Sequence, residues 1–197
     1  LIADQFYFEG RLIESRDASK RAVQVAERTL RPDHPELALS LRYLAATLGV
    51  LGDIQGSTPL AERALAIAER NFGANHHETA SYLWPLGSAA LREGSYATAR
   101  QRLRRVLSMY ETFYGPWHEF VAGALSLLAR ADASLGDFES ARREYARAVT
   151  IRERIGGKDH PYVANALTDL AKYVYRAEGR SAQALPLFER ALAIREK

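Results

Sequence analysis

The sequence has no cysteine and only one methionine. Without cysteine, the chain cannot form a disulfide bond, a thiolate metal site or a cysteine nucleophile. It also lacks any apolar run near the 18 residues that indicate a membrane-spanning helix. The first residues show neither the basic start nor the apolar block of a signal peptide. These absences favour a cytoplasmic protein with no membrane partner, and a first residue other than Met favours a fragment.

Strong charge of one sign is absent too. The chain has 27 Lys and Arg residues and 24 Asp and Glu residues, which gives a net charge of +3 at pH 7. A charge this small does not indicate nucleic-acid binding. Only four of the basic residues are lysines. This preference for arginine, together with abundant alanine and leucine, is typical of a GC-rich bacterial genome and predicts a bacterial source.

What the sequence does contain is a repeat. Equivalent residues recur every 42 positions, which indicates a tandem array of one structural unit. The repeated columns include His34, His76, His118 and His160, then Ala38, Ala80, Ala122 and Ala164, then Leu41, Leu83, Leu125 and Leu167. The spacing predicts a partial first repeat at 1–31, made of the end of one helix plus a second helix, and repeats at 32–73, 74–115, 116–157 and 158–197.

Each repeat is predicted to hold two helices. Apolar and small residues recur at helical spacing in residues 35–51 and again in residues 54–70. Leu-Gly-Asp at 51–53 separates the two segments, because glycine ends one helix and aspartate starts the next. The predicted fold class is therefore all-α, with antiparallel helix pairs that bury their apolar faces against neighbouring pairs.

The first helix of a repeat has a start signal of its own. Asp-His-Pro at 33–35 recurs at 159–161, and the proline fits the first helical turn, where its missing N–H costs nothing. Either Asp33 or His34 can cap the free N–H groups of that turn.

The chain resembles tetratricopeptide repeats (TPR), most clearly in STPLAERALAIAERNFG at 57–73 and ALPLFERALAIREK at 184–197. Its period is similar to that of the kinesin-light-chain type. The resemblance covers the whole chain and implies a right-handed superhelical solenoid of about four and a half repeats. It also implies a non-catalytic protein-protein interaction module without a cofactor, which binds a peptide or protein segment in a concave groove lined by the first helices.

The register of that family implies which residues face the groove. Arginine there offers a fork of N–H donors to a carboxylate, and Trp or Tyr offers a rigid anchor. A protein or peptide partner of acidic character is therefore expected. The candidate partner-binding residues are Arg42, Tyr43, Ser81, Trp84, Ser88, Arg92, Ser126, Arg130, Asn165, Asp169 and Lys172.

Two other functions stay open on the sequence. No polar capping helix is evident, so a homo-oligomer could form through uncapped ends, as a structural scaffold or as the sensor arm of a signalling protein. The arginine-rich segment 100–105 leaves RNA binding as a weaker alternative to a solvated helix face. Metal binding is not expected, because histidines one repeat apart lie roughly 10 Å from each other, too far to bind one ion. Catalysis is not expected either.

Two local departures from the repeat concern packing inside helices. Asp132 stands in a column that is otherwise Leu48, Ala90 and Val174, so it needs an arginine partner or must turn to solvent. Pro85 stands in mid-helix after Trp84, which predicts a kink because proline removes one backbone hydrogen bond.

Two further departures concern the joints between helices. The last repeat has one extra residue, seen at Gly179, which predicts either a π-bulge or a longer turn. Trp117 stands where other repeats have a polar residue that could cap the helix. It is expected to join an aromatic cluster that packs in the core or, if exposed, binds a partner. The other members of that cluster are Tyr110, Phe113, Tyr114 and Phe120.

Overall fold

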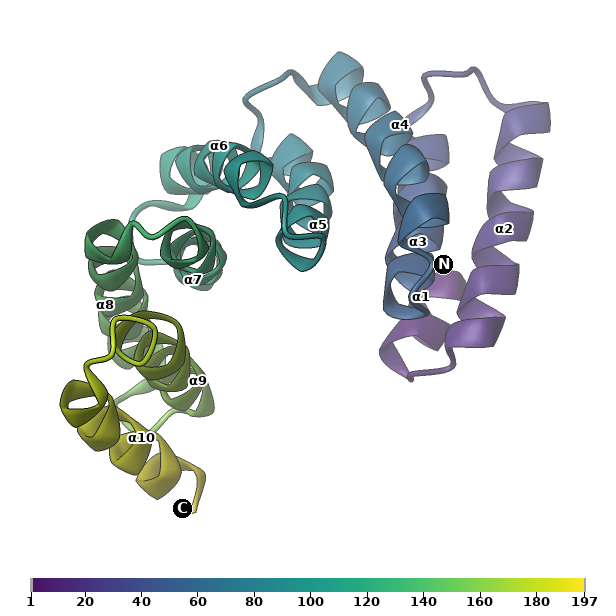
Figure 1. Cartoon of the computed structure of the whole chain (residues 1–197). Helices are drawn as coiled ribbons and strands as arrows, with labels where there is room; N and C mark the ends of the chain where they lie inside the picture. The colour runs from purple at the N-terminus through teal and green to yellow at the C-terminus, as the bar shows by residue number, and fades with distance from the viewer. Residues whose placement is uncertain (1, 197) are drawn as a thin grey trace. The chain divides into compact units, whose positions relative to one another are not determined.

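The computed structural model describes residues 2–196, and in that range it contains helices and no strand, as predicted (Figure 1). The elements are α1 (Ile2–Phe8), α2 (Leu12–Thr29), α3 (Pro35–Val50), α4 (Ile54–Phe72), α5 (His77–Arg92), α6 (Tyr96–Tyr114), α7 (Glu119–Ser134), α8 (Phe138–Gly156), α9 (Pro161–Leu170), the π-helix η1 (Ala171–Tyr175) and α10 (Ser181–Arg195). Each expected repeat from residue 32 onward therefore holds one helix pair.

The helices form two compact units, one up to Ala89 and one from Ala90 onward. In the first unit, α3 packs between α2 and α4. The predicted apolar face of α3 is buried there, since Leu37, Leu41 and Leu44 are at most 7% exposed. Small residues such as Ala64 on α4 line the same core, which lets the helix backbones approach closely.

In the second unit, the helices from α6 to α10 pack in chain order, each against the next. Leu103 on α6, Leu128 on α7 and Tyr145 on α8 are among its fully buried side chains. The core is continuous along the stack, because each helix contributes to the clusters on both of its sides. No pair of helices in this arrangement buries its apolar faces alone.

Histidine caps every first helix from α3 to α9. His34 Nδ1 accepts the backbone N–H of Glu36 at 3.2 Å, and His76, His118 and His160 make the same bond two residues ahead at the same distance. Of the two caps that the sequence allowed, the structure uses the histidine. The expectation that Trp117 replaces a cap is therefore wrong, because His118 beside it performs the capping.

Leu-Gly-Asp acts as predicted at the turn between the helices of a pair. Gly136 has φ of +82°, in the left-handed region that favours glycine, and the helix before it ends there. Asp137 then accepts the N–H of Ser140 at 3.1 Å as the N-cap of α8. These hydrogen bonds from Ser140 lower the pKa of the Asp137 carboxyl.

Glutamate and arginine connect successive second helices. Glu27 on α2 pairs with Arg63 on α4, and Glu111 on α6 pairs with Arg147 on α8. In the last repeat, Glu153 on α8 pairs with Arg190 on α10. All these side chains are between one quarter and one half exposed, so each pair contributes only about 0.2–1 kcal/mol of stability. Their regular position makes them markers of repeat register.

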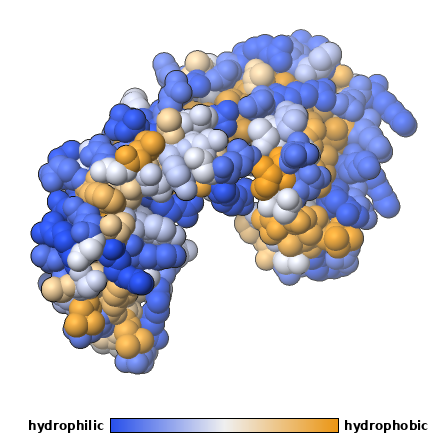
Figure 2. Space-filling model, in the orientation of Figure 1, coloured by the Kyte–Doolittle hydropathy of each residue, from blue (hydrophilic) through white to orange (hydrophobic). Residues whose placement is uncertain are grey.

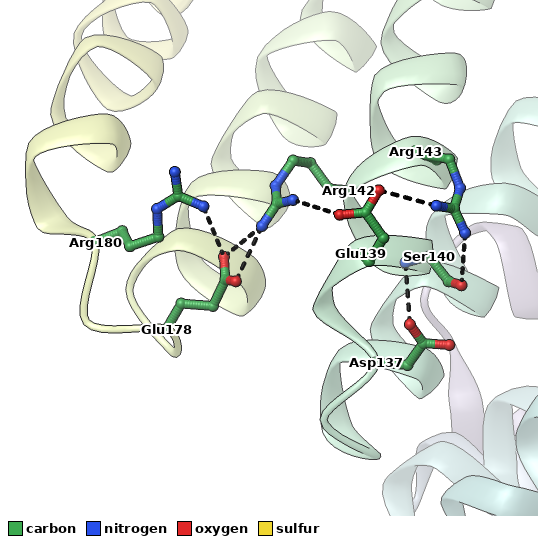
Figure 3. A network of polar contacts seen from close by, with 7 residues as sticks. All are labelled: Asp137, Glu139, Ser140, Arg142, Arg143, Glu178 and Arg180. Atoms are coloured by element: carbon green, nitrogen blue, oxygen red, sulfur yellow. Dashed lines mark hydrogen bonds and ion pairs between the residues drawn. The ribbon is translucent and has the colours of Figure 1, made fainter.

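The extra residue of the last repeat is absorbed as a π-helix, which decides between the two predicted alternatives. The π-helix η1 follows α9 directly, and Gly179 with φ of +74° closes the turn before α10. Figure 3 shows how this turn is tied to α8: Arg142 donates to both carboxylate oxygens of Glu178, at 3.0 and 2.7 Å. Arg142 also lies over the Tyr175 ring, 5.6 Å from its centroid.

Helix α5 is continuous from His77 to Arg92 and includes Pro85. Proline has no N–H, so the carbonyl of Ser81 has no partner from position 85 in the helix ladder. The kink expected from this missing bond stays a prediction.

We expect His34→Ala to lower the free energy of unfolding by about 1 kcal/mol, because the Glu36 N–H loses its acceptor. His34→Asn retains a side-chain acceptor and should cost clearly less. Urea unfolding followed by circular dichroism measures both variants. Equal losses for alanine and asparagine would contradict the capping role.

Candidate functional site

The second unit buries a carboxylate among its helices. Asp132 on α7 is 0% exposed, and its two oxygens lie 3.4 Å from Arg100 and 3.6 Å from Arg104, both on α6. The structure therefore satisfies Asp132 with arginine and does not turn it to solvent. The sequence favours a solvated face for segment 100–105, and the Arg104 side chain is indeed 55% exposed, but both arginines also contact Asp132.

Glu144 on α8 adds a second carboxyl group to this cluster. Burial and the neighbouring Asp132 carboxylate raise the pKa of Glu144 to about 8. Its Oε2 is buried and has no hydrogen-bond partner among the described residues. A proton on Glu144 at neutral pH avoids two negative charges side by side in this buried cluster. This pairing could not be predicted from the sequence, because a glutamate side chain on a helix is usually exposed to solvent.

We expect the free energy of unfolding to fall as pH rises from about 5 to about 8. The folded chain retains the Glu144 proton up to a pKa of about 8, whereas the unfolded chain releases it near 4.5. Glu144→Gln imitates the protonated acid, so it should remove this contribution and stabilise the chain at pH 8.5 by on the order of 1–3 kcal/mol.

Urea unfolding at pH 5 and pH 8.5 measures the difference between parent and variant. The matched control is Glu189→Gln, because Glu189 is exposed on α10. An equal pH dependence of parent and Glu144→Gln would show that Glu144 is ionised in the folded chain.

In the first unit, the structure places one candidate arginine between two tyrosine rings. The Arg42 guanidinium lies 5.2 Å from the ring centroid of Tyr43 and 5.1 Å from that of Tyr82. Its Nε is buried without a hydrogen-bond partner, and no carboxylate of the described residues pairs with it. Aromatic rings attract a cation without neutralising it, so Arg42 keeps a full positive charge.

The other candidates of the first unit lie on α5 and are half-buried. They are Ser81, Trp84 and Ser88. The hydroxyl of Ser81 already donates to the backbone oxygen of Glu78 at 2.7 Å. Arg42 is thus the group in this set that combines an unpaired charge with a fixed position.

In the second unit, the structure brings several cations around one carboxyl group. Asp169 on α9 is influenced by Arg130 on α7, Lys172 on η1, Arg152 on α8 and Arg195 on α10. Burial raises the pKa of Asp169, and these four positive charges act in the opposite direction. We call these five residues the Asp169 cluster. Arg130 has no ion pair within the described part of the chain.

The remaining candidates of this unit connect to the same cluster, except one. Asn165 accepts a hydrogen bond from Arg195 at 3.2 Å, and Ser126 accepts one from Arg152 at 3.1 Å. Arg92 is exposed at the end of α5, and nothing in the structure joins it to them.

Sequence reasoning missed Arg152 and Arg195. Both come from second helices, whereas the family register assigns the face to first helices. Arg152 has no arginine at the equivalent position of the preceding repeat, where Tyr110 stands, and its equivalent in the last repeat, Arg195, is displaced by the extra residue there. Only the packing of α8 and α10 against the first helices brings these side chains to the cluster.

The described residues contain no group of three His, Asp or Glu side chains close enough to hold a metal ion. Within the same range, no helix is both long and apolar enough to cross a membrane.

Comparison with known proteins concerns the whole chain. The family model for the tetratricopeptide repeat matches residues 1–69, 41–112 and 120–197. No curated protein matches the chain.

Among solved structures, a Podosopora anserina putative kinesin light chain with TPR-like repeats is 24% identical, over 98% of this chain and 92% of that one, with a TM-score of 0.82. BtubC from P. vanneervenii is 23% identical, over 98% and 77%, also with a TM-score of 0.82. A Rap protein complexed with competence and sporulation factor is 18% identical, over 98% and 51%, with a TM-score of 0.77. At these identities the likeness shows a shared fold.

Proposed function

Because the chain belongs to the tetratricopeptide-repeat family, we propose that it is a protein-interaction module that binds an acidic peptide or protein segment. The binding face is the one formed by the first helices of its pairs, which is the face that the family register implies. No step of this function requires catalysis or a cofactor.

The observation that carries the proposal is the excess of positive charge in the Asp169 cluster. Four cations act electrostatically on the Asp169 carboxyl group, and one of them, Arg152, pairs with a second carboxylate, Glu119, at 3.1 Å. Arg130 and Lys172 therefore have no carboxylate of their own. A carboxylate supplied by a partner would bind Arg130 through two parallel N–H donors, which is the strong geometry for such a pair.

Other arginines of the chain provide the contrast. Arg63, Arg147 and Arg190 connect neighbouring helices, and each has a glutamate partner within the chain. Arginines that serve the fold are thus paired, whereas Arg42 in the first unit and Arg130 in the second are not. Unpaired arginine beside tyrosine is also the combination enriched at protein interfaces.

The structural likeness supports a protein partner in a second way. One of the similar solved structures is a Rap protein complexed with competence and sporulation factor, so a chain of this fold accommodates another molecule. RNA binding loses support, because Arg100 and Arg104 are engaged with Asp132. Self-association, a signalling role, a bacterial source and a cytoplasmic location stay predictions from the sequence.

We expect Arg130→Glu to weaken binding of an acidic peptide at least about tenfold, because one charge-assisted contact is worth about 1.5–3 kcal/mol. The probe is a labelled eight-residue peptide of glutamate and serine with a C-terminal leucine, measured by fluorescence anisotropy. Arg143→Glu is the matched control, because Arg143 lies on the exposed side of α8 and pairs with Glu139.

Loss of binding in both variants, or in neither, would count against the cluster as the site. Stronger binding of a peptide with lysine in place of glutamate would contradict the acidic partner. Static light scattering of the unliganded chain tests the self-association alternative. That alternative predicts an apparent mass that rises to twice the mass of one chain as the protein concentration increases.

A further inference from the structure

The second unit exposes large apolar side chains at one end of its helices. Phe113, Trp117, Phe120, Ile155 and Tyr162 are each between 47% and 57% exposed. They lie where α6 and α8 end and where α7 and α9 begin. We call these five residues the aromatic edge. Apolar residues also reach the surface between hydrophilic ones elsewhere on the face shown in Figure 2, so exposure alone does not define a site.

Direct contacts order the rings at the α6–α7 junction. Phe113 meets Tyr114 edge to face at a centroid distance of 4.8 Å, and Tyr114 meets Phe120 at 5.3 Å. Tyr110 stacks on Phe120 at 5.4 Å, and only Tyr110 of these rings is buried. Four of the five residues expected from the sequence therefore form the cluster, with Tyr110 in the core and Phe113 and Phe120 exposed, whereas Trp117 contacts none of these rings.

Two arginines of α8 extend this surface to the α8–α9 junction. Arg154 lies over the Trp117 ring at 4.4 Å, and Arg152 lies over Tyr162 at 5.9 Å. Arg152 also pairs with Glu119, the residue next to Phe120. These contacts connect the half-exposed rings of Trp117 and Tyr162 to α8.

The repeat itself shows that the fold does not need these apolar residues. Forty-two positions earlier, at the α4–α5 junction, Asn71, Asn75 and Glu78 occupy the places of Phe113, Trp117 and Phe120. That junction has the same histidine cap, His76, and its three polar residues are exposed. A junction of the same kind therefore forms with polar side chains. The exposed aromatic residues at the α6–α7 junction are thus not required for the fold. Contiguous apolar surface on a folded chain indicates an interaction site.

Charged residues beside the aromatic edge indicate the chemistry of a partner that would bind there. Arg154 and Lys158 are exposed and have no carboxylate partner within the described residues. Arg152, in contrast, is satisfied by Glu119. A partner that covers the aromatic edge would bring its own groups against two unpaired cations, and carboxylates are the groups that gain from this position.

We propose that the aromatic edge binds an amphipathic helix of another protein, with apolar side chains on one face and carboxylates beside them. Such a helix presents apolar residues at positions i, i+3, i+4 and i+7, a row that reaches from one helix junction to the next. Arg152 contacts both this site and the Asp169 cluster, but the five residues of the aromatic edge are not members of that cluster, and the proposal does not depend on the function proposed for it. A strand of nucleic acid could stack on the same rings, but two unpaired cations are few for a phosphate backbone.

The experiment uses Trp117 as its reporter. The chain has two tryptophans, so Trp84→Phe leaves Trp117 alone to emit. The probe is a synthetic 18-residue amphipathic helix with leucine on one face and glutamate on the other. We expect a saturable blue shift of the emission. A matched peptide with lysine in place of glutamate should bind at least about tenfold more weakly, because its charges meet Arg154 and Lys158.

A swap taken from the chain itself tests the apolar contacts. Phe113→Asn with Phe120→Glu installs the residues of the first unit at equivalent positions and keeps Trp117. We expect it to weaken binding of the glutamate peptide at least about tenfold. Circular dichroism and the unfolding midpoint of the swapped chain, compared with the parent, separate this loss from a loss of folding. A second variant, Arg154→Gln, should reduce the preference for glutamate over lysine without this structural change.

Four results would overturn the proposal. They are the absence of a saturable shift, an equal response to both peptides, an intact response in the swapped chain, and saturation by a ten-nucleotide single strand instead of the peptide. A shift that follows protein concentration, with a doubled mass in light scattering, would identify a second copy of the chain as the occupant. Arg130→Glu should leave the Trp117 response unchanged. Loss of the Trp117 emission shift in that variant would show that the aromatic edge and the Asp169 cluster act as one site.

Discussion

Everything in this chain depends on the burial of an apolar stripe of each helix against its neighbours in the stack. A buried leucine contributes roughly 2 kcal/mol when it leaves water, and one helix pair cannot cover its own stripe. The alanine columns make the stacking close enough to exclude water, as Ala38, Ala122 and Ala164 are all 0% exposed. Polar interactions such as the histidine caps then determine where the first helix of a pair begins. They add specificity to a stability that comes mainly from packing.

The second unit buries several polar side chains among its packed helices. Asp132 contacts two arginines of α6, and Glu144 lies near it with a buried oxygen that has no hydrogen-bond partner among the described residues. Tyr145 is fully buried, its hydroxyl has no hydrogen-bond partner among the described residues, and burial raises its pKa. Such groups are costly in a core. Tyr145 is also close enough to Arg130 and Asp169 for their charges to act on its hydroxyl group.

The sequence predicted the helices well and the membership of the Asp169 cluster only in part, and the reason is physical. Helix boundaries follow from local signals that recur along the repeats, such as the histidine at 34 and the glycine at 136, so the 42-residue period locates them. Binding residues are departures from the repeat. Arg130 and Asp169 were found because first helices have a known register, whereas Arg152 and Arg195 reach the same cluster from second helices. The partner of Asp132 could be expected to be arginine, but the choice of Arg100 and Arg104 needed the helix packing.

The π-helix η1 has a consequence for how such an array can change in length. Up to Leu170 the last repeat keeps the period, and by Gly179 every residue is displaced by one. Glu153 nevertheless reaches Arg190 over 37 positions, as Glu111 reaches Arg147 over 36. An inserted residue is therefore contained between two neighbouring helices and is not passed along the stack. A repeat protein built in this way can gain a residue in one helix, present new side chains there, and leave the alignment of all its other repeats intact.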